Sequence, residues 1–121
     1  MFIQFAELPV FNQDRAKSFY IDQFGCRVVA DTPMVPDGWR WIEMKFQGAE
    51  TTLHFLRRPD EMLSNGPTLV LIDDDVEGTI SALAERGVKI LTDPKAAPYA
   101  ANKTVAEIED SEGNRIVISS R

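Results

Sequence analysis

The spacing of hydrophobic residues predicts strands and one helix in the first half of the chain. Residues 2–10 alternate as a strand does, with Leu8 on one face and Phe5 and Glu7 on the other. The next apolar residues recur every three or four positions, which predicts a helix over about 13–23. Renewed alternation predicts further strands at about 26–30, 39–46 and 51–56, and two prolines with an Asp-Gly pair predict a loop over 31–38.

The second half of the chain follows the same order of patterns. Three aspartates, Asp73 to Asp75, precede an apolar stripe, and we expect them to cap a helix over about 76–86. Adjacent residues at the end of a strand do not converge on one point, so capping is favoured over a metal cluster. Strands are predicted at 68–72, 88–91, 103–109 and 115–119, with a loop around Pro94 and Pro98.

The two halves match at a constant spacing. Gly25 and Gly87 lie 62 residues apart, and the same spacing aligns Leu8 with Val70. Agreement of helix end, strand and loop at one spacing indicates an internal duplication. We therefore predict one domain over 1–121, with a first copy at about 1–57, a polar linker at about 57–66 and a second copy at about 67–121.

Composition and charge exclude several classes of partner. The net charge is −6 and the isoelectric point about 4.7, which disfavours nucleic acid and anionic membrane surfaces. The segment MFIQFAELPVFNQDR lacks the basic start of a signal peptide, so we expect a cytoplasmic protein. The only cysteine, Cys26, excludes an internal disulfide and is expected to be buried under the helix.

Three segments carry a resemblance to a known family. They are DRAKSFYIDQFGCRVV (14–29), DDVEGTISALAERGVKIL (74–91) and EDSEGNRIVI (109–118). In order and content they resemble the vicinal oxygen chelate superfamily of glyoxalases, bleomycin resistance proteins and extradiol dioxygenases. The resemblance implies an α+β fold of two βαβββ modules, forming a curved, half-open mixed β-sheet barrel with its helices outside. It also implies a small-molecule ligand in the concave face and a homodimer.

The resemblance further implies four metal-ligand positions on the concave strands. In this sequence they fall at Phe5, Pro67 (Thr68 if the register slips by one), Val117 and His54. Only His54 is a usual ligand, and one imidazole cannot hold a divalent metal against water. We therefore expect no metal and no other cofactor. A divalent metal in a displaced site stays open as an alternative, with ligands drawn from Glu7, Glu43 and Glu107.

The same face contains the residues that we expect to contact a ligand. The predicted ligand-binding set is Phe5, Glu7, Trp39, Trp41, His54, Glu107 and Val117. Aromatic faces bind flat rings and cations, and carboxylates favour basic groups. His54 and Glu7 are also candidates for catalysis by proton transfer. The simpler alternatives are that His54 is a packed strand residue and that the two tryptophans fill the cavity or a dimer seam.

Three functions are compatible with this pattern. The leading hypothesis is a metal-free protein that binds or sequesters an aromatic or cationic small molecule, as bleomycin resistance proteins do. The second is an enzyme resembling glyoxalase I (lactoylglutathione lyase) or an extradiol dioxygenase, with non-standard ligands. The third is a dimeric scaffold protein without a ligand. The scaffold alone does not choose between them, because one fold hosts unrelated functions.

Overall fold

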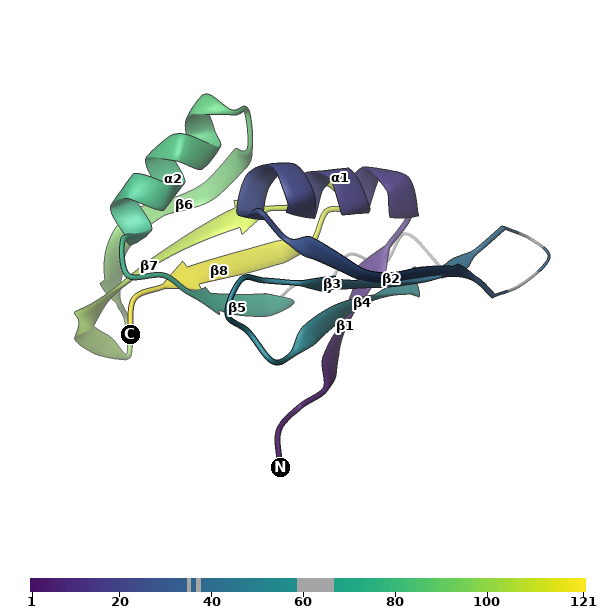
Figure 1. The fold of residues 1–121 in the computed structure, drawn as a ribbon. Coiled ribbons are helices and arrows are strands. Elements are labelled where there is room, and N and C mark those ends of the chain that lie inside the picture. Colours follow the sequence, from purple (N-terminus) through teal and green to yellow (C-terminus); the bar gives the residue numbers. More distant parts are fainter. Residues whose placement is uncertain (35, 37, 59–66) are drawn as a thin grey trace. The chain divides into compact units, whose positions relative to one another are not determined.

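The chain folds into two compact units (Figure 1), Met1–Glu61 and Met62–Arg121. The structure is a computed structural model that describes residues 1–34, 36, 38–58 and 67–121. Most of the predicted linker therefore lies outside the described residues. The assignment of 1–121 to a single domain stays a prediction.

Unit 1 is a four-stranded mixed sheet with one helix. Its strands pair in the order β1-β4-β3-β2; β1 is parallel to β4, and the other pairs are antiparallel. Leu8, Ile42 and Phe55 are fully buried and form the core of this unit with α1. The elements are β1 (Phe5–Val10), α1 (Gln13–Phe24), β2 (Arg27–Pro33), β3 (Arg40–Lys45) and β4 (Thr52–Arg57).

Unit 2 repeats this arrangement with the same topology. Its sheet order is β5-β8-β7-β6, and again only the first pair is parallel. The elements are β5 (Leu69–Ile72), α2 (Val76–Glu85), β6 (Lys89–Ala97), β7 (Ala100–Glu109) and β8 (Arg115–Ser119). The predicted α+β class with two βαβββ modules is confirmed, and each sheet is open.

Both helices begin where the sequence predicts and end within one residue of the predicted position. The Asn12 side chain caps α1 by accepting a hydrogen bond from the backbone N–H of Arg15, and Gly25 ends it at φ 67°. Asp75 caps α2 through the N–H of Gly78, and Asp73 accepts from the N–H of Asp75. Asp73 and Asp75 are thus engaged at the helix start, whereas Asp74 pairs with Arg121 at 3.1 Å. Neither α1 nor α2 is long and apolar enough to cross a membrane.

Three strands are longer than the sequence predicts, and one of them is β7, which begins at Ala100 rather than at 103. β2 continues to Pro33, into the segment predicted as a loop, and β6 passes through Pro94 to Ala97. Both are edge strands, where proline's missing N–H costs little, and the pairing of β6 with β7 shifts register between Thr92 and Lys95. Pro33 and Pro94 therefore lie in strands, and the predictions of loops at 31–33 and around Pro94 are wrong, whereas Pro98 lies in a turn as predicted.

The duplication has a one-residue change of register that a constant spacing misses. Leu8 and Val10 are fully buried, whereas Val70 and Ile72, 62 residues later, are 60% and 54% exposed. In β5 and β8 the residues that face the core match those of β1 and β4 at a spacing of 63, as Phe55 and Ile118 do. The alignment of Leu8 with Val70 is therefore wrong, although Gly25 and Gly87 still match, both at positive φ.

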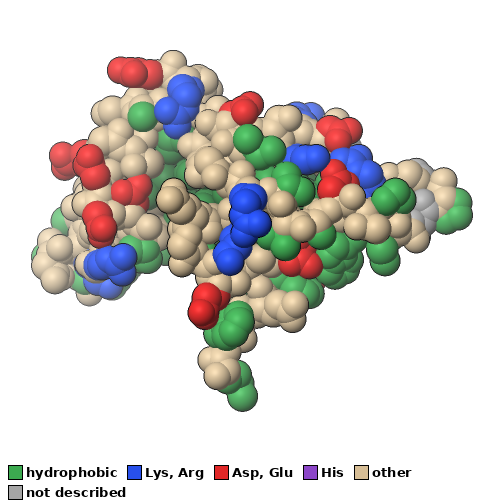
Figure 2. Space-filling view, viewed as in Figure 1, with side chains coloured by type: hydrophobic (Ala, Val, Ile, Leu, Met, Phe, Trp, Pro, Cys, Tyr) green, Lys and Arg blue, Asp and Glu red, His purple; other side chains and the backbone are tan. Residues whose placement is uncertain are grey.

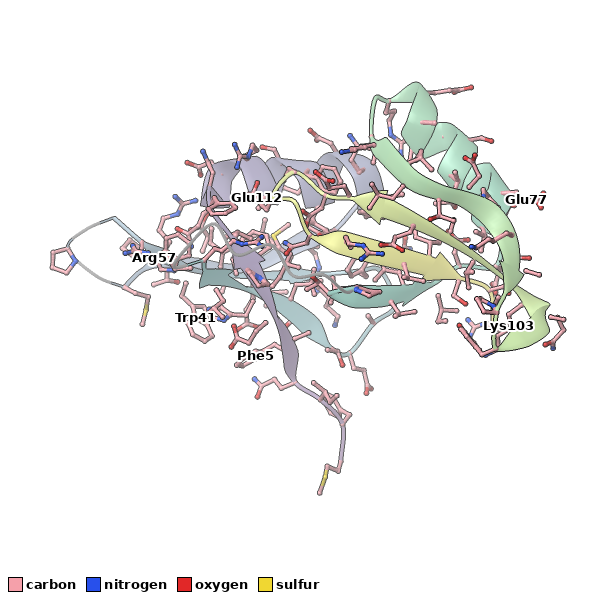
Figure 3. The ribbon with its side chains drawn as sticks, turned by 180° about the vertical axis from the view of Figure 1, so that it is seen from behind. Phe5, Trp41, Arg57, Glu77, Lys103 and Glu112 are labelled. Atoms are coloured by element: carbon pink, nitrogen blue, oxygen red, sulfur yellow. The ribbon has the colours of Figure 1, made fainter. Side chains whose placement is uncertain are left out.

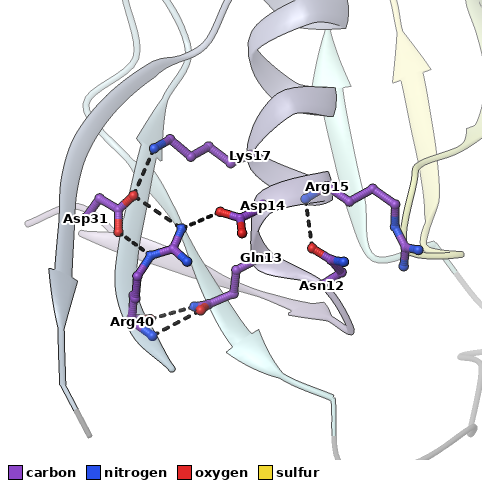
Figure 4. A network of polar contacts seen from close by, with 7 residues as sticks. All are labelled: Asn12, Gln13, Asp14, Arg15, Lys17, Asp31 and Arg40. Carbon is purple, nitrogen blue, oxygen red and sulfur yellow. Dashed lines mark hydrogen bonds and ion pairs between the residues drawn. The ribbon is translucent and has the colours of Figure 1, made fainter. Parts of the chain in front are cut away.

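A polar network ties the start of α1 to β2 and β3 (Figure 4). Asp31 accepts hydrogen bonds from Arg40 Nε at 2.7 Å and from Lys17 Nζ at 2.8 Å, and Asp14 accepts from Arg40 Nη2 at 2.7 Å. The Gln13 side chain bonds the backbone N–H and C=O of Arg40. The guanidinium of Arg40 and then the ammonium of Lys17 hold the pKa of Asp31 below its ordinary value.

We expect Asp31→Asn to lower the free energy of unfolding by about 1 kcal/mol at pH 7, because it removes the charge that both cations contact. A lowered pKa gives stability that is present above the unfolded-state value, about 3.8, and is lost as pH falls through the folded value. Urea unfolding at pH 7 and pH 3 should therefore show a smaller difference from wild type at pH 3. Asp22→Asn, on the exposed face of α1, is the control and should change little at either pH; an equal loss in both variants would contradict the assignment.

Candidate functional site

Three strands of unit 1 place aromatic side chains on the sheet face opposite α1. Since Leu53 and Phe55 face the core, His54 between them faces the other way, and it lies directly opposite Glu7 on β1 and Glu43 on β3. Figure 3 shows Phe5 and Trp41 on the side of the sheet away from α1. We call the three rings, Phe5, Trp41 and His54, the aromatic face.

The rings of the aromatic face are in mutual contact. Trp41 stacks on His54 with centroids 3.7 Å apart and an interplanar angle of 27°. Phe5 meets Trp41 and His54 edge-on, at 5.8 and 5.5 Å. Edge-to-face and offset-stacked arrangements are the favourable geometries for aromatic pairs, so the cluster is held by its own contacts.

Two carboxylates fix the orientation of these rings. Glu7 Oε2 lies 2.7 Å from His54 Nδ1. Since an ionised carboxylate only accepts hydrogen bonds, Nδ1 donates to it, and Nε2 is then the acceptor of the neutral imidazole. Glu43 accepts from the Trp41 indole N–H at 2.8 Å and from the Thr52 hydroxyl at 2.9 Å. His54 is only 7% exposed, whereas the side chain of Glu7 is 45% exposed and remains open to water.

The structure brings together four of the residues predicted to bind a ligand, and the others lie elsewhere. Phe5, Glu7, Trp41 and His54 are in contact, whereas the Trp39 ring lies 4.6 Å from the guanidinium of Arg57. Glu107 and Val117 lie opposite each other on β7 and β8 of unit 2, where Glu107 accepts from Arg115. As ligand contacts, all of these residues stay predictions.

Sequence reasoning missed one partner of Trp39 and one partner of Glu43. Arg57 was assigned to the start of the polar linker, and the bond from the Thr52 hydroxyl to Glu43 was not foreseen. Alternation along β4 places Thr52 on the same face as His54. Alternation therefore predicts the sheet face on which Thr52 lies, but it does not predict which side chain on β3 the Thr52 hydroxyl contacts.

Three of the four positions for a metal carry side chains that do not fit one, and His54 is the only usual ligand among them. At the spacing of 63, Phe5 corresponds to Thr68 and His54 to Val117, so the alternative Thr68 is favoured over Pro67. A phenyl ring and an isopropyl group have no donor atom, and a neutral hydroxyl is a weak ligand. Glu7, Glu43 and Glu107 are each engaged with another side chain. Within 1–34, 36, 38–58 and 67–121, no three His, Cys, Asp or Glu side chains are grouped as metal ligands.

Cys26 is unsuited to nucleophilic chemistry. It is buried immediately after α1, as expected from the sequence, and burial raises the pKa of its thiol to about 12. The thiolate is the nucleophilic form of cysteine, and it is scarce at neutral pH when the pKa is this high. The chemistry of the described site therefore rests on the rings and carboxylates.

Comparison with known proteins gives a consistent family match. The model of the Glyoxalase/Bleomycin resistance protein/Dioxygenase superfamily matches residues 2–118. The protein YetH of Bacillus subtilis (strain 168), itself uncharacterized, is 29% identical over 107 residues, covering 85% of this chain and 84% of YetH.

Solved structures show the same fold. TnmS3, an antibiotic binding protein from Streptomyces sp. CB03234, is 31% identical with a TM-score of 0.82, covering 99% of this chain and 95% of its own. A superfamily member from Sphaerobacter thermophilus DSM 20745 is 24% identical with a TM-score of 0.86, covering 100% and 98%.

Proposed function

Because this chain belongs to the Glyoxalase/Bleomycin resistance protein/Dioxygenase superfamily, we propose that it binds a flat, cationic aromatic small molecule without a metal. The observation that carries this proposal is the aromatic face, in which Trp41 and Phe5 present rings beside a water-accessible carboxylate. A planar ligand would stack or dock edge-on against these rings, and Glu7 would neutralise its charge.

The polar contacts within the cluster suit binding better than metal chemistry. Glu43 holds the indole of Trp41 in place, which reduces the side-chain entropy that a ligand must remove when it binds. His54 is held by Glu7 on one edge and covered by Trp41 on one face. Such a preformed surface does not require a divalent ion to orient a ligand.

A relative supports this class of function. TnmS3 is described as an antibiotic binding protein and is similar to almost the whole of this chain. Sequestration of a comparable small molecule is therefore our proposal here. We also propose a cytoplasmic location, in keeping with the single free cysteine, and a homodimer, because members of this superfamily often dimerise.

A matched pair of probes tests the proposal. N-methylacridinium is flat and cationic, and acridine is nearly isosteric but neutral near pH 8. Isothermal titration at 0.15 M salt should show the cation binding at least about tenfold more tightly, roughly 1.4 kcal/mol. Glu7→Gln should remove most of that preference. The absence of heat with either compound, and with a wider set of aromatic cations, would count against the proposal.

Metal content tests the other half of the proposal. Elemental analysis of protein purified without chelator should give far less than one nickel, zinc, iron or manganese per chain. A stoichiometric metal would overturn the metal-free assignment and favour an enzyme.

One observation favours a second candidate, which is proton transfer without a metal. The 2.7 Å contact of Glu7 with His54 orients an imidazole in the way that a general base is often oriented. For this role, Nε2 would have to reach a bound substrate. Substrate turnover that is abolished in His54→Gln, with ligand binding retained, would support this candidate.

A further inference from the structure

An uncompensated pair of cations lies on the same hairpin as Trp41, outside the aromatic face. Arg27 on β2 and Lys45 on β3 are directly opposite in the antiparallel pairing, and we call them the basic pair. Directly opposed side chains lie about 5 Å apart at Cβ, and like charges in this arrangement destabilise the sheet. Within the described part of the chain, neither residue has an ion-pair or hydrogen-bond partner for its side chain.

The second copy shows what an ordinary pairing looks like at this place. The corresponding first pair of the β6–β7 hairpin is Lys89 opposite Glu109, and these two form an ion pair at 3.4 Å. The same hairpin position is therefore neutralised in unit 2 and doubly positive in unit 1. This difference stands out in a chain whose net charge is −6.

A pocket opens beside the basic pair. Its volume is about 480 Å³, and both cations line it. Glu50 also lines it, but within the described residues that carboxylate makes no ion pair with Arg27 or Lys45, so the three side chains leave a net charge of +1. The remaining lining comes from the end of α1 and the β3–β4 turn: Gly25, Phe46, Gln47, Gly48 and Ala49.

We propose that this pocket binds the oxyanion group, phosphate or carboxylate, of a small molecule between Arg27 and Lys45. An anion would relieve the repulsion between the two cations, and guanidinium and ammonium groups are the usual partners of such oxygens. Lys45 lies four residues after Trp41 on β3, roughly 13 Å at about 3.3 Å per residue. The site is thus distinct from the Trp41–His54 stack.

Titration with inorganic phosphate, acetate and chloride at constant ionic strength tests this site. Amide NMR signals of Gly48 and Ala49 should shift with phosphate or acetate and saturate at millimolar concentration, whereas chloride should have little effect. Whichever of phosphate and acetate binds more tightly identifies the type of oxyanion. Because these probes have no aromatic ring, the result is independent of the function proposed above.

Matched variants separate this site from general attraction to lysines. Lys45→Gln and Arg27→Gln should each weaken binding at least fivefold, whereas Lys89→Gln, in the neutralised hairpin, should change it less than twofold. Without anion, Lys45→Gln should be at least as stable to heat as wild type, because it removes a repulsion. The proposal fails if Lys45→Gln keeps its affinity, if chloride binds equally well, or if Lys45→Gln unfolds at a clearly lower temperature without anion.

Discussion

Replacing Trp41 with alanine should weaken the binding of N-methylacridinium by about 30-fold. Trp41 stacks on His54 and meets Phe5 edge-on, so its loss removes the largest ring surface of the aromatic face. Truncating a central aromatic residue of a binding site costs about 2 kcal/mol or more, and each 1.4 kcal/mol corresponds to about tenfold in affinity. Titration calorimetry of the wild type and the variant measures the difference directly.

Trp39 provides the matched control for this experiment. It is the only other tryptophan and lies two residues earlier, where its ring contacts Arg57. Trp39→Phe should bind N-methylacridinium with an affinity within about threefold of wild type. The fluorescence of Trp41, the remaining tryptophan, should be quenched as the probe binds. A large loss of affinity in Trp39→Phe with little change in Trp41→Ala would move the ligand to the Trp39–Arg57 contact.

Phe55→Ala should lower the free energy of unfolding by about 3–5 kcal/mol. Phe55 is fully buried and contacts Tyr20, which in turn stacks on Phe24 and meets Phe46 edge-on. Without the ring, the protein loses the free energy gained by moving that ring from water into the core. The mutation also leaves a cavity that the rigid sheet cannot close. Denaturant unfolding monitored by circular dichroism gives the free energy of unfolding. The slope m should be the same in the variant and the wild type.

The neighbouring residue shows whether burial causes this loss. Leu56 follows Phe55 on β4, lies on the opposite face and is 46% exposed. Leu56→Ala should change the free energy of unfolding by less than about 1 kcal/mol. Equal losses in the two variants would mean that α1 does not cover the β4 face assigned to it.

Local signals were enough to predict the helices and most strands. Asn12 and Asp75 are side chains that satisfy free N–H groups, and Gly25 tolerates positive φ, so the helix ends follow from chemistry close in sequence. The lengths of β2 and β6 cannot be predicted from residues close in sequence. A proline inside a strand is acceptable only at a sheet edge, and edge position is a property of the whole sheet.

The face on which the site residues lie was also predictable, but their contacts were not. Alternation places Phe5, Trp41 and His54 on the side opposite the buried Leu8, Ile42 and Phe55. The bonds from Glu7 to His54 and from Trp41 to Glu43 depend on strand register and rotamers, which alternation leaves undetermined. The opposition of Lys45 to Arg27 was likewise not predictable, because it appears only once the hairpin is paired.

The shift from 62 to 63 has a practical meaning for protein engineering. To install an imidazole in the second repeat at the place that His54 occupies in the first, a designer should alter Val117, which lies opposite Val70 just as His54 lies opposite Glu7. The position reached by simple counting is Ile116, and its side chain is fully buried. A histidine there would bring an unsatisfied ring nitrogen into the hydrocarbon interior, and the molecule would be weakened with no new surface chemistry gained.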